Sequence, residues 1–245
     1  MILEMKGVNA FYGNSQILFD MNLGVEAGDS VCILGRNGVG KSTTLRSIIG
    51  QMSPKNKASL TGSVRFDGKE ISRQPSFRIC RAGISYVPQG RMIFPSLTAK
   101  ENLLLAEKKG VDQKNYWTLD RIYELFPRLK ERESVKGTLL SGGEQQMLAI
   151  ARGLIQNPKL LLLDEITEGL APIVVEELGQ IVAKLRTMDV SILLAEQSVA
   201  FAMNVSRYCY IIEKGTVVYR GETASIPEQV IETYLGAGAR GEQFA

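Results

Sequence analysis

The hydrophobic pattern alternates between short continuous apolar runs and longer segments in which apolar residues recur every three or four positions. Continuous runs bounded by polar or turn residues predict buried strands, whereas the wider spacing predicts helices. The strands are expected at residues 30–34, 63–67, 84–87, 159–165 and 191–194. The helices between them are expected at residues 41–50, 144–155 and 172–187. This alternation indicates an α/β fold around a parallel sheet.

The pattern changes at both ends of the chain and in one internal stretch. Residues 1–30 predict short strands with turns, and residues 208–219 predict a hairpin. From 98 to 157 the spacing is helical, so we expect a helical insertion between two strands of the sheet. The remaining predictions are a polar loop at 53–61, helices at 99–109, 119–126 and 198–205, and a frayed tail at 236–245.

Composition removes several classes of chemistry. The chain has no histidine, which excludes histidine metal sites, Ser-His-Asp and Cys-His triads, and a histidine pH switch. Its net charge of +3 is too small for a nucleic-acid footprint. Cys32, Cys80 and Cys209 are scattered, which indicates a reduced, intracellular setting. Neither a signal peptide nor a membrane-spanning run of ~18 apolar residues is visible, so we expect a soluble chain that can bind a membrane protein.

The strongest chemical motif follows the predicted strand at 30–34 and opens the next helix. It matches the pattern GxxxxGKS/T, whose glycines let backbone N–H groups surround phosphate oxygens at a helix N-terminus. Lys41 can then reach the β- and γ-phosphates, Ser42 can hold Mg²⁺, and Thr43 is a further donor. An ordinary glycine-rich turn is the disfavoured alternative. The segment consists of Gly35, Arg36, Asn37, Gly38, Val39, Gly40, Lys41 and Ser42.

A second motif ends an apolar strand with two carboxylates, Asp164 and Glu165. In an α/β sheet the carboxyl ends of the strands form the ligand-binding edge. Together with the phosphate loop, this pair reads as a Walker B segment. Asp164 would belong to the Mg²⁺ shell, and Glu165 would orient or deprotonate the attacking water.

The third motif is Leu-Ser-Gly-Gly-Glu-Gln-Gln at residues 140–146. A capping box would explain Ser141 and Glu144, because each can bond the backbone N–H of the other. It would not explain Gly142 and Gly143, which weaken a helix start but permit close approach of a ligand to the backbone. This segment is therefore a second candidate phosphate site at a helix N-terminus.

The segment at 140–146 is similar to the signature motif of ATP-binding-cassette (ABC) ATPases, and the three motifs stand in that family's order. The resemblance covers nearly the whole chain and implies one domain over residues 1–245. Its fold would be α/β, that of a P-loop NTPase with a RecA-like parallel sheet and an N-terminal antiparallel β subdomain. The resemblance assigns this core to residues 1–88 and 159–230, and an inserted α-helical subdomain to residues 90–158.

The same resemblance implies roles for residues outside the three motifs. Tyr12 would stack on adenine, and Gln89 would meet Mg²⁺ and the attacking water. Residues 168–171 would form the D-loop, and Gln197 would face the γ-phosphate where most of the family has histidine. The signature, Ser141 to Glu144, would act on the ATP of a second ABC ATPase subunit, identical or not. Ile166 and Ala171 depart from the usual proline and aspartate, which leaves the D-loop geometry open.

The resemblance extends to a subfamily. The segments VPQGRMIFPSLT, ENLLLA, DEITEGLAP and LLAEQS look like the ATPases of branched-chain amino acid and urea importers, between which the sequence does not choose. The resemblance implies a peripheral ATPase on the cytoplasmic face of the membrane. Its partners would be permease subunits docked at residues 90–103, indirectly a substrate-binding protein, and no nucleic acid. The alternatives are a lipopolysaccharide-export ATPase, a non-transport ABC ATPase, and a P-loop kinase or GTPase. With glutamine at 197, Glu165 would be the only base, and the pH–rate profile would lack a histidine-like step near ~6.5.

Overall fold

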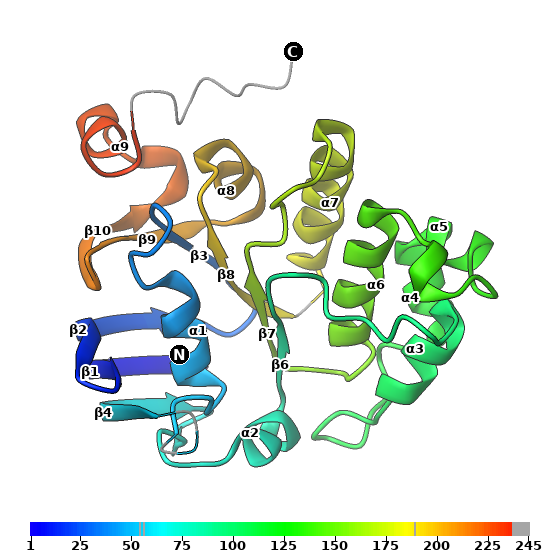
Figure 1. Ribbon diagram of the computed structural model, residues 1–245, viewed down its shortest axis with the longest axis horizontal. Helices are drawn as coiled ribbons and strands as arrows, with labels where there is room; N and C mark the ends of the chain where they lie inside the picture. Colours follow the sequence, from blue (N-terminus) through cyan, green and yellow to red (C-terminus); the bar gives the residue numbers. More distant parts are fainter. Residues whose placement is uncertain (54, 56, 189, 237–245) are drawn as a thin grey trace.

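The computed structural model describes residues 1–53, 55, 57–188 and 190–236, and it contains two β-sheets flanked by helices (Figure 1). The predicted tail at 236–245 lies outside the described residues except for Gly236. The smaller sheet is antiparallel, with strand order β2-β1-β4-β5. Its strands are β1 (Leu3–Tyr12), β2 (Ser15–Val25), β4 (Ala58–Phe66) and β5 (Lys69–Glu70).

The larger sheet has the strand order β10-β9-β3-β8-β7-β6, and all its neighbours are parallel except β10 on β9. Every residue of β3, β7 and β8 is buried, which explains why these strands read as continuous apolar runs. The strands are β3 (Ser30–Leu34), β6 (Ile84–Val87), β7 (Leu160–Asp164), β8 (Ser191–Glu196), β9 (Tyr208–Glu213) and β10 (Thr216–Glu222).

Helices cover the larger sheet on both faces. Val31 and Ile33 of β3 pack in one core cluster with α1 and the antiparallel sheet, whereas Cys32 and Leu34 pack in the other with α6, α7 and α8. Figure 1 shows α3 to α6 grouped at the right, beside β6 and β7. The α-helices are α1 (Lys41–Ile48), α2 (Ser76–Ala82), α3 (Ala99–Ala106), α4 (Leu119–Leu125), α5 (Pro127–Glu131), α6 (Gly142–Leu154), α7 (Pro172–Leu185), α8 (Val199–Val205) and α9 (Glu228–Tyr234).

The structure confirms the α/β class and corrects several details of the sequence prediction. The polar loop at 53–61 is wrong, because β4 already begins at Ala58 and pairs with β1 in an antiparallel sheet with an exposed face. The helix predicted to end at Gly50 ends at Ile48. Gly142 and Gly143 lie inside the first turn of α6 rather than in a turn before it. Helices α2, α5 and α9 were not predicted.

Register brings the chemical motifs to one edge of the larger sheet. Leu34 of β3 pairs with Glu196 of β8, and Asp164 of β7 pairs with Ala195 of β8. The phosphate loop, the two carboxylates at the end of β7 and Gln197 therefore lie at the carboxyl ends of three neighbouring parallel strands. Among the described residues, no helix has both the length and the apolar character that crossing a bilayer requires.

Candidate active site

The phosphate loop joins β3 to α1 and encloses a hollow of about 220 Å³. Two of its glycines are required by close packing. A Cβ on Gly35 would lie 2.7 Å from the Ile212 carbonyl oxygen, and one on Gly40 would lie 2.8 Å from a Leu18 methyl carbon. Gly40 also has a φ of 112°, which side chains other than glycine rarely adopt. The hollow is lined by Tyr12, Ile17, Gly38, Gly40, Lys41, Ser42, Thr43 and Glu165.

Lys41 and Glu165 form a buried ion pair beside this hollow. The Lys41 Nζ lies 2.8 Å from the Glu165 Oε1, and the two residues are 3% and 8% exposed. The Lys41 ammonium also donates to the carbonyl oxygens of Gly35 (2.9 Å) and Arg36 (3.1 Å). A phosphate that enters the hollow would therefore replace Glu165 as the anionic partner of Lys41. The Glu165 carboxylate, which also lines the hollow, would then be free to contact another group.

Ser42 and Asp164 lie together at the start of α1. The Ser42 hydroxyl donates to Asp164 Oδ1 at 2.8 Å, and the Tyr86 hydroxyl donates to Asp164 Oδ2 at the same distance. Burial raises the pKa of Asp164, while the hydrogen bonds from Tyr86 and Ser42 act in the opposite direction. A hydroxyl and a carboxylate side by side are the hard oxygen donors that Mg²⁺ prefers, so this pair fits the metal.

Gln89 lies after β6 and joins two carboxylates. Its Nε2 donates to Glu165 Oε2 at 3.0 Å and to Glu168 Oε2 at 2.6 Å. The amide nitrogen therefore faces Glu165, the residue expected to act on water, and Glu168 in the expected D-loop. The expected contact of Gln89 with the metal stays a prediction, since its hydrogen bonds in the structure go to these two carboxylates.

Tyr12, the expected adenine contact, lines the phosphate-loop hollow from the end of β1. Hydrogen bonding to Tyr12 raises the pKa of Arg46 on α1. Interactions with Tyr86 raise the pKa of Arg46 further. Arg46 thereby connects Tyr12 to Tyr86, whose hydroxyl donates to Asp164. Neither Arg46 nor Tyr86 was predicted as a site residue from the sequence.

The signature segment lies outside this hollow. Ser141 caps α6 by accepting from the Glu144 N–H at 3.2 Å, and the Glu144 carboxylate accepts from the Ser141 N–H at 2.7 Å, as the capping box predicts. Although burial opposes it, these bonds and Arg132 hold the pKa of Glu144 below its ordinary value. A Cβ on Gly142 or Gly143 would lie 2.7 Å from an Arg91 nitrogen or a Val174 methyl carbon. The two glycines therefore have a packing role within the subunit as well.

The D-loop departures have visible consequences. Ile166 is buried in the core, and Ala171 precedes α7 without providing a side-chain cap. Pro172 occupies the first turn of α7, where its missing N–H costs no helical hydrogen bond. Glu165 and Gly169, on either side of Ile166 and Thr167, both have left-handed backbone, with φ values of 46° and 65°.

Gln197 is exposed, whereas its neighbour Glu196 is buried. The Glu196 carboxylate accepts from the Thr167 N–H at 3.3 Å and from the Thr167 hydroxyl at 3.0 Å. Burial raises the pKa of Glu196 to about 7. The expected switch segment comprises Glu196 and Gln197, of which only Gln197 was expected to face the nucleotide. A titration near neutral pH would therefore report a buried carboxyl rather than an imidazole.

Glu196 makes the stability of the protein depend on pH. A carboxyl whose pKa is raised on folding binds a proton in the native state between pH ~4.5 and ~7 while the unfolded chain has lost it. The free energy of unfolding should therefore fall by up to about 3 kcal/mol across that range. In urea unfolding at pH 5 to 8, Glu196→Gln should flatten this dependence. Glu176→Gln on the exposed face of α7 should keep it, and equal slopes for wild type and Glu196→Gln would contradict the assignment.

The Tyr86 hydroxyl should matter for metal binding. Tyr86→Phe removes one of the two donors that favour the charged form of Asp164. Because metal ligands must be deprotonated, we expect the Mg²⁺ concentration for half-maximal ATP hydrolysis to rise about three- to tenfold. The rise should be larger at pH 6 than at pH 8. Tyr219→Phe on β10 is the matched control, and an unchanged Mg²⁺ requirement at pH 6 would refute the role of Tyr86.

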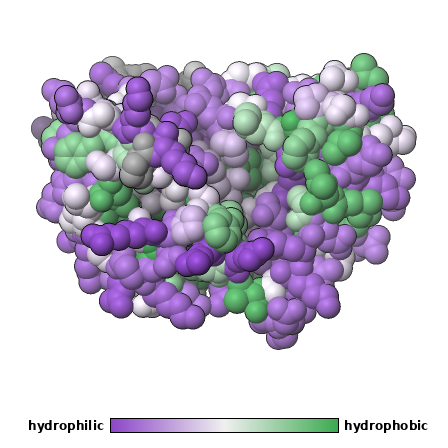
Figure 2. Space-filling view, turned by 60° about the horizontal axis from the view of Figure 1, so that its bottom comes forward, coloured by the Kyte–Doolittle hydropathy of each residue, from purple (hydrophilic) through white to green (hydrophobic). Residues whose placement is uncertain are grey.

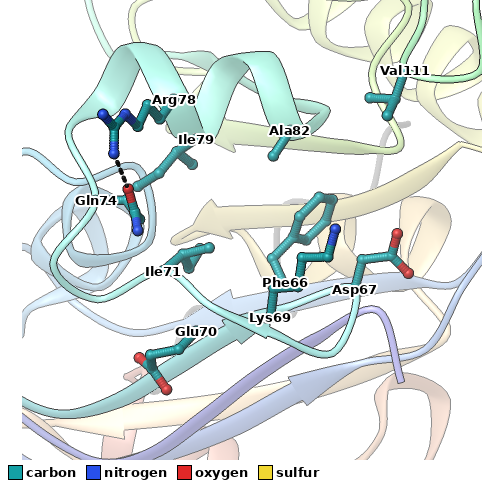
Figure 3. Close-up of a pocket in the computed structure, with 10 residues that line it drawn as sticks. All are labelled: Phe66, Asp67, Lys69, Glu70, Ile71, Gln74, Arg78, Ile79, Ala82 and Val111. Carbon is teal, nitrogen blue, oxygen red and sulfur yellow. Dashed lines mark hydrogen bonds between the residues drawn. The ribbon is translucent and has the colours of Figure 1, made fainter.

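A separate hollow of about 230 Å³ lies between α2 and the β4–β5 turn (Figure 3). Its floor is apolar, with Phe66, Ile71 and Ile79 beneath a charged rim. The rim carboxylates already have partners, since Asp67 lies 2.8 Å from the Lys159 Nζ and Glu70 accepts from Ser63 and Ser72. No residue of the sequence motifs lines this hollow, so the candidate chemistry belongs to the phosphate loop.

Comparisons with known proteins reveal relatives along most of the chain. A family model described as ABC transporter matches residues 18–168. The chain is 40% identical to the high-affinity branched-chain amino acid transport ATP-binding protein BraG of Pseudomonas aeruginosa, covering 96% of this chain and 100% of that one. It is 32% identical to the lipopolysaccharide export system ATP-binding protein LptB of Haemophilus influenzae, covering 99% and 98%. A solved dimeric ATP-binding cassette in a post-hydrolysis state with ADP and Pi is 24% identical, with a TM-score of 0.75 and coverage of 91% and 100%.

Proposed function

This chain belongs to the ABC transporter family as an ATP-binding and ATP-hydrolysing subunit, and from that premise we propose that it powers an importer. The substrate class is branched-chain or other hydrophobic amino acids, amides or urea. The observation that carries this proposal is the 40% identity to BraG over its full length, against 32% to LptB. A lipopolysaccharide-export ATPase is the second candidate, because LptB is also matched over nearly its whole length.

The hydrolytic roles follow from the contacts of the site. The phosphate-loop N–H groups and Lys41 bind the β- and γ-phosphates, and Glu165 turns from Lys41 to the attacking water. Gln89 holds the Glu165 carboxylate in place through its amide nitrogen. Ser42 and Asp164 would hold Mg²⁺, which when bound neutralises charge on the phosphates. Gln197 can donate a hydrogen bond to the γ-phosphate but cannot take up a proton at neutral pH.

The partners follow from the two halves of the site. ABC ATPases act as dimers with transmembrane permeases. Since the signature lies outside the phosphate-loop hollow, Ser141 to Glu144 are proposed to complete the ATP site of a second subunit. The ATPase would then be peripheral, held at the cytoplasmic face of the membrane by its permease.

The docking surface is proposed on the helical subdomain of residues 90–158. Figure 2 shows apolar surface on the right, the side where Figure 1 places α3 to α6. Met92, Phe94 and Leu105 of this subdomain are exposed. The Asn102 side chain holds the Phe94 backbone. Its Oδ1 accepts from the Phe94 N–H at 2.9 Å, and its Nδ2 donates to the Phe94 carbonyl at 3.0 Å. An apolar surface fixed in this way is suited to receive a helix of the permease.

Uptake by whole cells tests the substrate class. A strain that lacks the chain should lose uptake of labelled leucine, and wild type but not Glu165→Gln should restore it. Loss of urea uptake with leucine uptake intact would assign the urea subtype. Unchanged uptake of both, together with a defect in surface lipopolysaccharide, would replace the importer by the export ATPase.

A further inference from the structure

Arg91 lies in the loop that follows β6, and its backbone is held in an uncommon conformation. The φ angles of Arg91 and Met92 are 66° and 31°, and the Met92 N–H donates to the Gly90 carbonyl at 2.7 Å. Positive φ is strained for residues other than glycine, so the surrounding contacts must hold these two consecutive residues in place. The Arg91 side chain reaches the start of α6, where its guanidinium lies beside Gly142.

The Arg91 guanidinium contacts two functional loops. Its Nη2 donates to the Gly169 carbonyl of the D-loop at 3.4 Å. Its face lies on the signature, since a Cβ on Gly142 would be 2.7 Å from Nη1 and 3.1 Å from Cζ. The guanidinium thus fills the space that the missing side chain of Gly142 leaves. A single side chain joins the docking segment, the signature helix and the D-loop.

A second arginine anchors the same loop to the other end of α6. The Arg152 Nη1 donates to the Met92 carbonyl at 2.8 Å, and the Arg152 guanidinium lies 4.5 Å from the centre of the Phe94 ring. The loop is therefore fastened to α6 at both ends of the helix. A displacement of Met92 or Phe94 would consequently reach the first turn of α6 through Arg91.

Electrostatics alone would not place Arg91 there. The N-terminus of a helix carries partial positive charge and disfavours a cation. The position is set instead by the turn at Gly90 to Met92 and by the D-loop carbonyl. The 3.4 Å bond from Arg91 to the Gly169 carbonyl is weak enough to rearrange when the permease moves the loop at Gly90 to Met92.

We propose that Arg91 is a positioning residue that couples the docking segment to the signature helix and the D-loop. The proposal deepens the proposed function, because it rests on the docking role of this segment and on the dimer. Arg91 sets the relative position of Gly142 and Gly169, the two backbone segments that a partner's ATP and phosphate loop would meet. Removing its guanidinium should therefore impair closure of the dimer and leave ATP binding to each monomer intact.

ATP-driven dimerisation of the purified subunit in a Glu165→Gln background tests this coupling. With Arg91→Met, the ATP concentration for half-maximal dimer in size-exclusion chromatography should rise about fivefold or more, while fluorescent-nucleotide binding to the monomer stays within about twofold. Arg91→Lys, which keeps the charge but not the planar fork, should recover only part of the effect. Arg81→Met, which changes an exposed arginine on α2, should have none.

A double-mutant cycle separates this role from a general loss of stability. Gly142→Ala places a methyl group where the guanidinium lies, so it should displace Arg91 and produce the same defect alone. Because both changes break one contact, their combination should be no worse than either one. Additive effects, or dimerisation of Arg91→Met at the parental ATP concentration, would overturn the proposal. If the Glu165→Gln parent itself stays monomeric, the dimer in the proposed function fails and this proposal fails with it.

Uptake adds the readout for the docking segment. Arg91→Met should lower leucine uptake in cells by about fivefold or more, whereas Arg81→Met should not. Normal uptake by Arg91→Met would overturn the coupling while leaving the importer assignment intact. Loss of uptake with both arginine variants would point to expression or folding and count against a specific role for Arg91.

Discussion

Glu165→Gln should lower ATP turnover by about a hundredfold or more while the protein still binds ATP. Loss of a positioned base or water-orienting carboxylate typically costs 10²- to 10⁴-fold. The amide keeps the size of the side chain and can still contact Gln89. It removes the buried ion pair with Lys41, whose Nζ now lies 2.8 Å from Glu165. Because Lys41 would no longer have to leave an anionic partner, ATP affinity should be unchanged or tighter.

Three measurements test this prediction. Phosphate release at saturating ATP reports turnover, equilibrium binding reports ATP affinity, and size-exclusion chromatography reports dimerisation. Wild type should dimerise only transiently, whereas Glu165→Gln should accumulate as an ATP-bound dimer. Glu168→Gln is the matched control, since Glu168 also accepts from the Gln89 amide but lies in the D-loop. Its turnover should remain within a few-fold of wild type. Near-normal turnover of Glu165→Gln would remove Glu165 from the hydrolytic role.

The sheet could be predicted because burial on both faces leaves a strong signal in the sequence. Strands β3, β7 and β8 are buried at every position, so each reads as a continuous apolar run. Strand β4 gave no such signal at its start, because Ser59, Thr61 and Gly62 lie on an exposed part of an antiparallel sheet. Pairing with β1, rather than local composition, decides that Ala58 to Thr61 are extended.

The motifs predicted the residues of the phosphate loop and the carboxylates, but not the contacts that hold them. Tyr86 and Asp164 are 78 positions apart, and Arg91 and Gly169 are equally distant in sequence. Such pairs meet only because the parallel sheet places β6 beside β7. Tyr86, Arg91 and Glu196 stand inside or beside segments that the sequence analysis quoted. Their neighbours alone carried no signal of what they contact.

The absence of histidine does not exclude another group that titrates near neutral pH. Without an imidazole, a rate profile free of a step near neutral pH was expected. Glu196, one residue before Gln197, has a pKa raised by burial to about 7 and binds Thr167 between Walker B and the D-loop. A step in the rate near pH 7 that disappears in Glu196→Gln would therefore leave Glu165 as the base.

Ser141→Arg should abolish ATP-driven dimerisation and lower turnover by about a hundredfold, with ATP affinity of the monomer unchanged. Ser141 caps α6 at the edge that is proposed to face the partner's γ-phosphate, and it does not line the phosphate-loop hollow of its own chain. A bulky cation there fills the space for the phosphate. It also removes a helix cap, which typically costs ~1 kcal/mol of stability.

Two further variants separate the lost cap from the blocked interface. Ser141→Ala loses the same hydroxyl without adding bulk, so it should weaken stability slightly but still allow dimerisation. Thr118→Arg removes the cap of α4, where the Thr118 hydroxyl accepts from the Arg121 N–H, and should leave turnover nearly intact. If Ser141→Arg hydrolysed ATP at the rate of Thr118→Arg, the signature would act within its own subunit or not at all, and catalysis could not depend on a second copy. If only Ser141→Arg loses turnover and nucleotide binding is preserved, the ATP bound by one subunit must meet the Ser141 segment of another subunit.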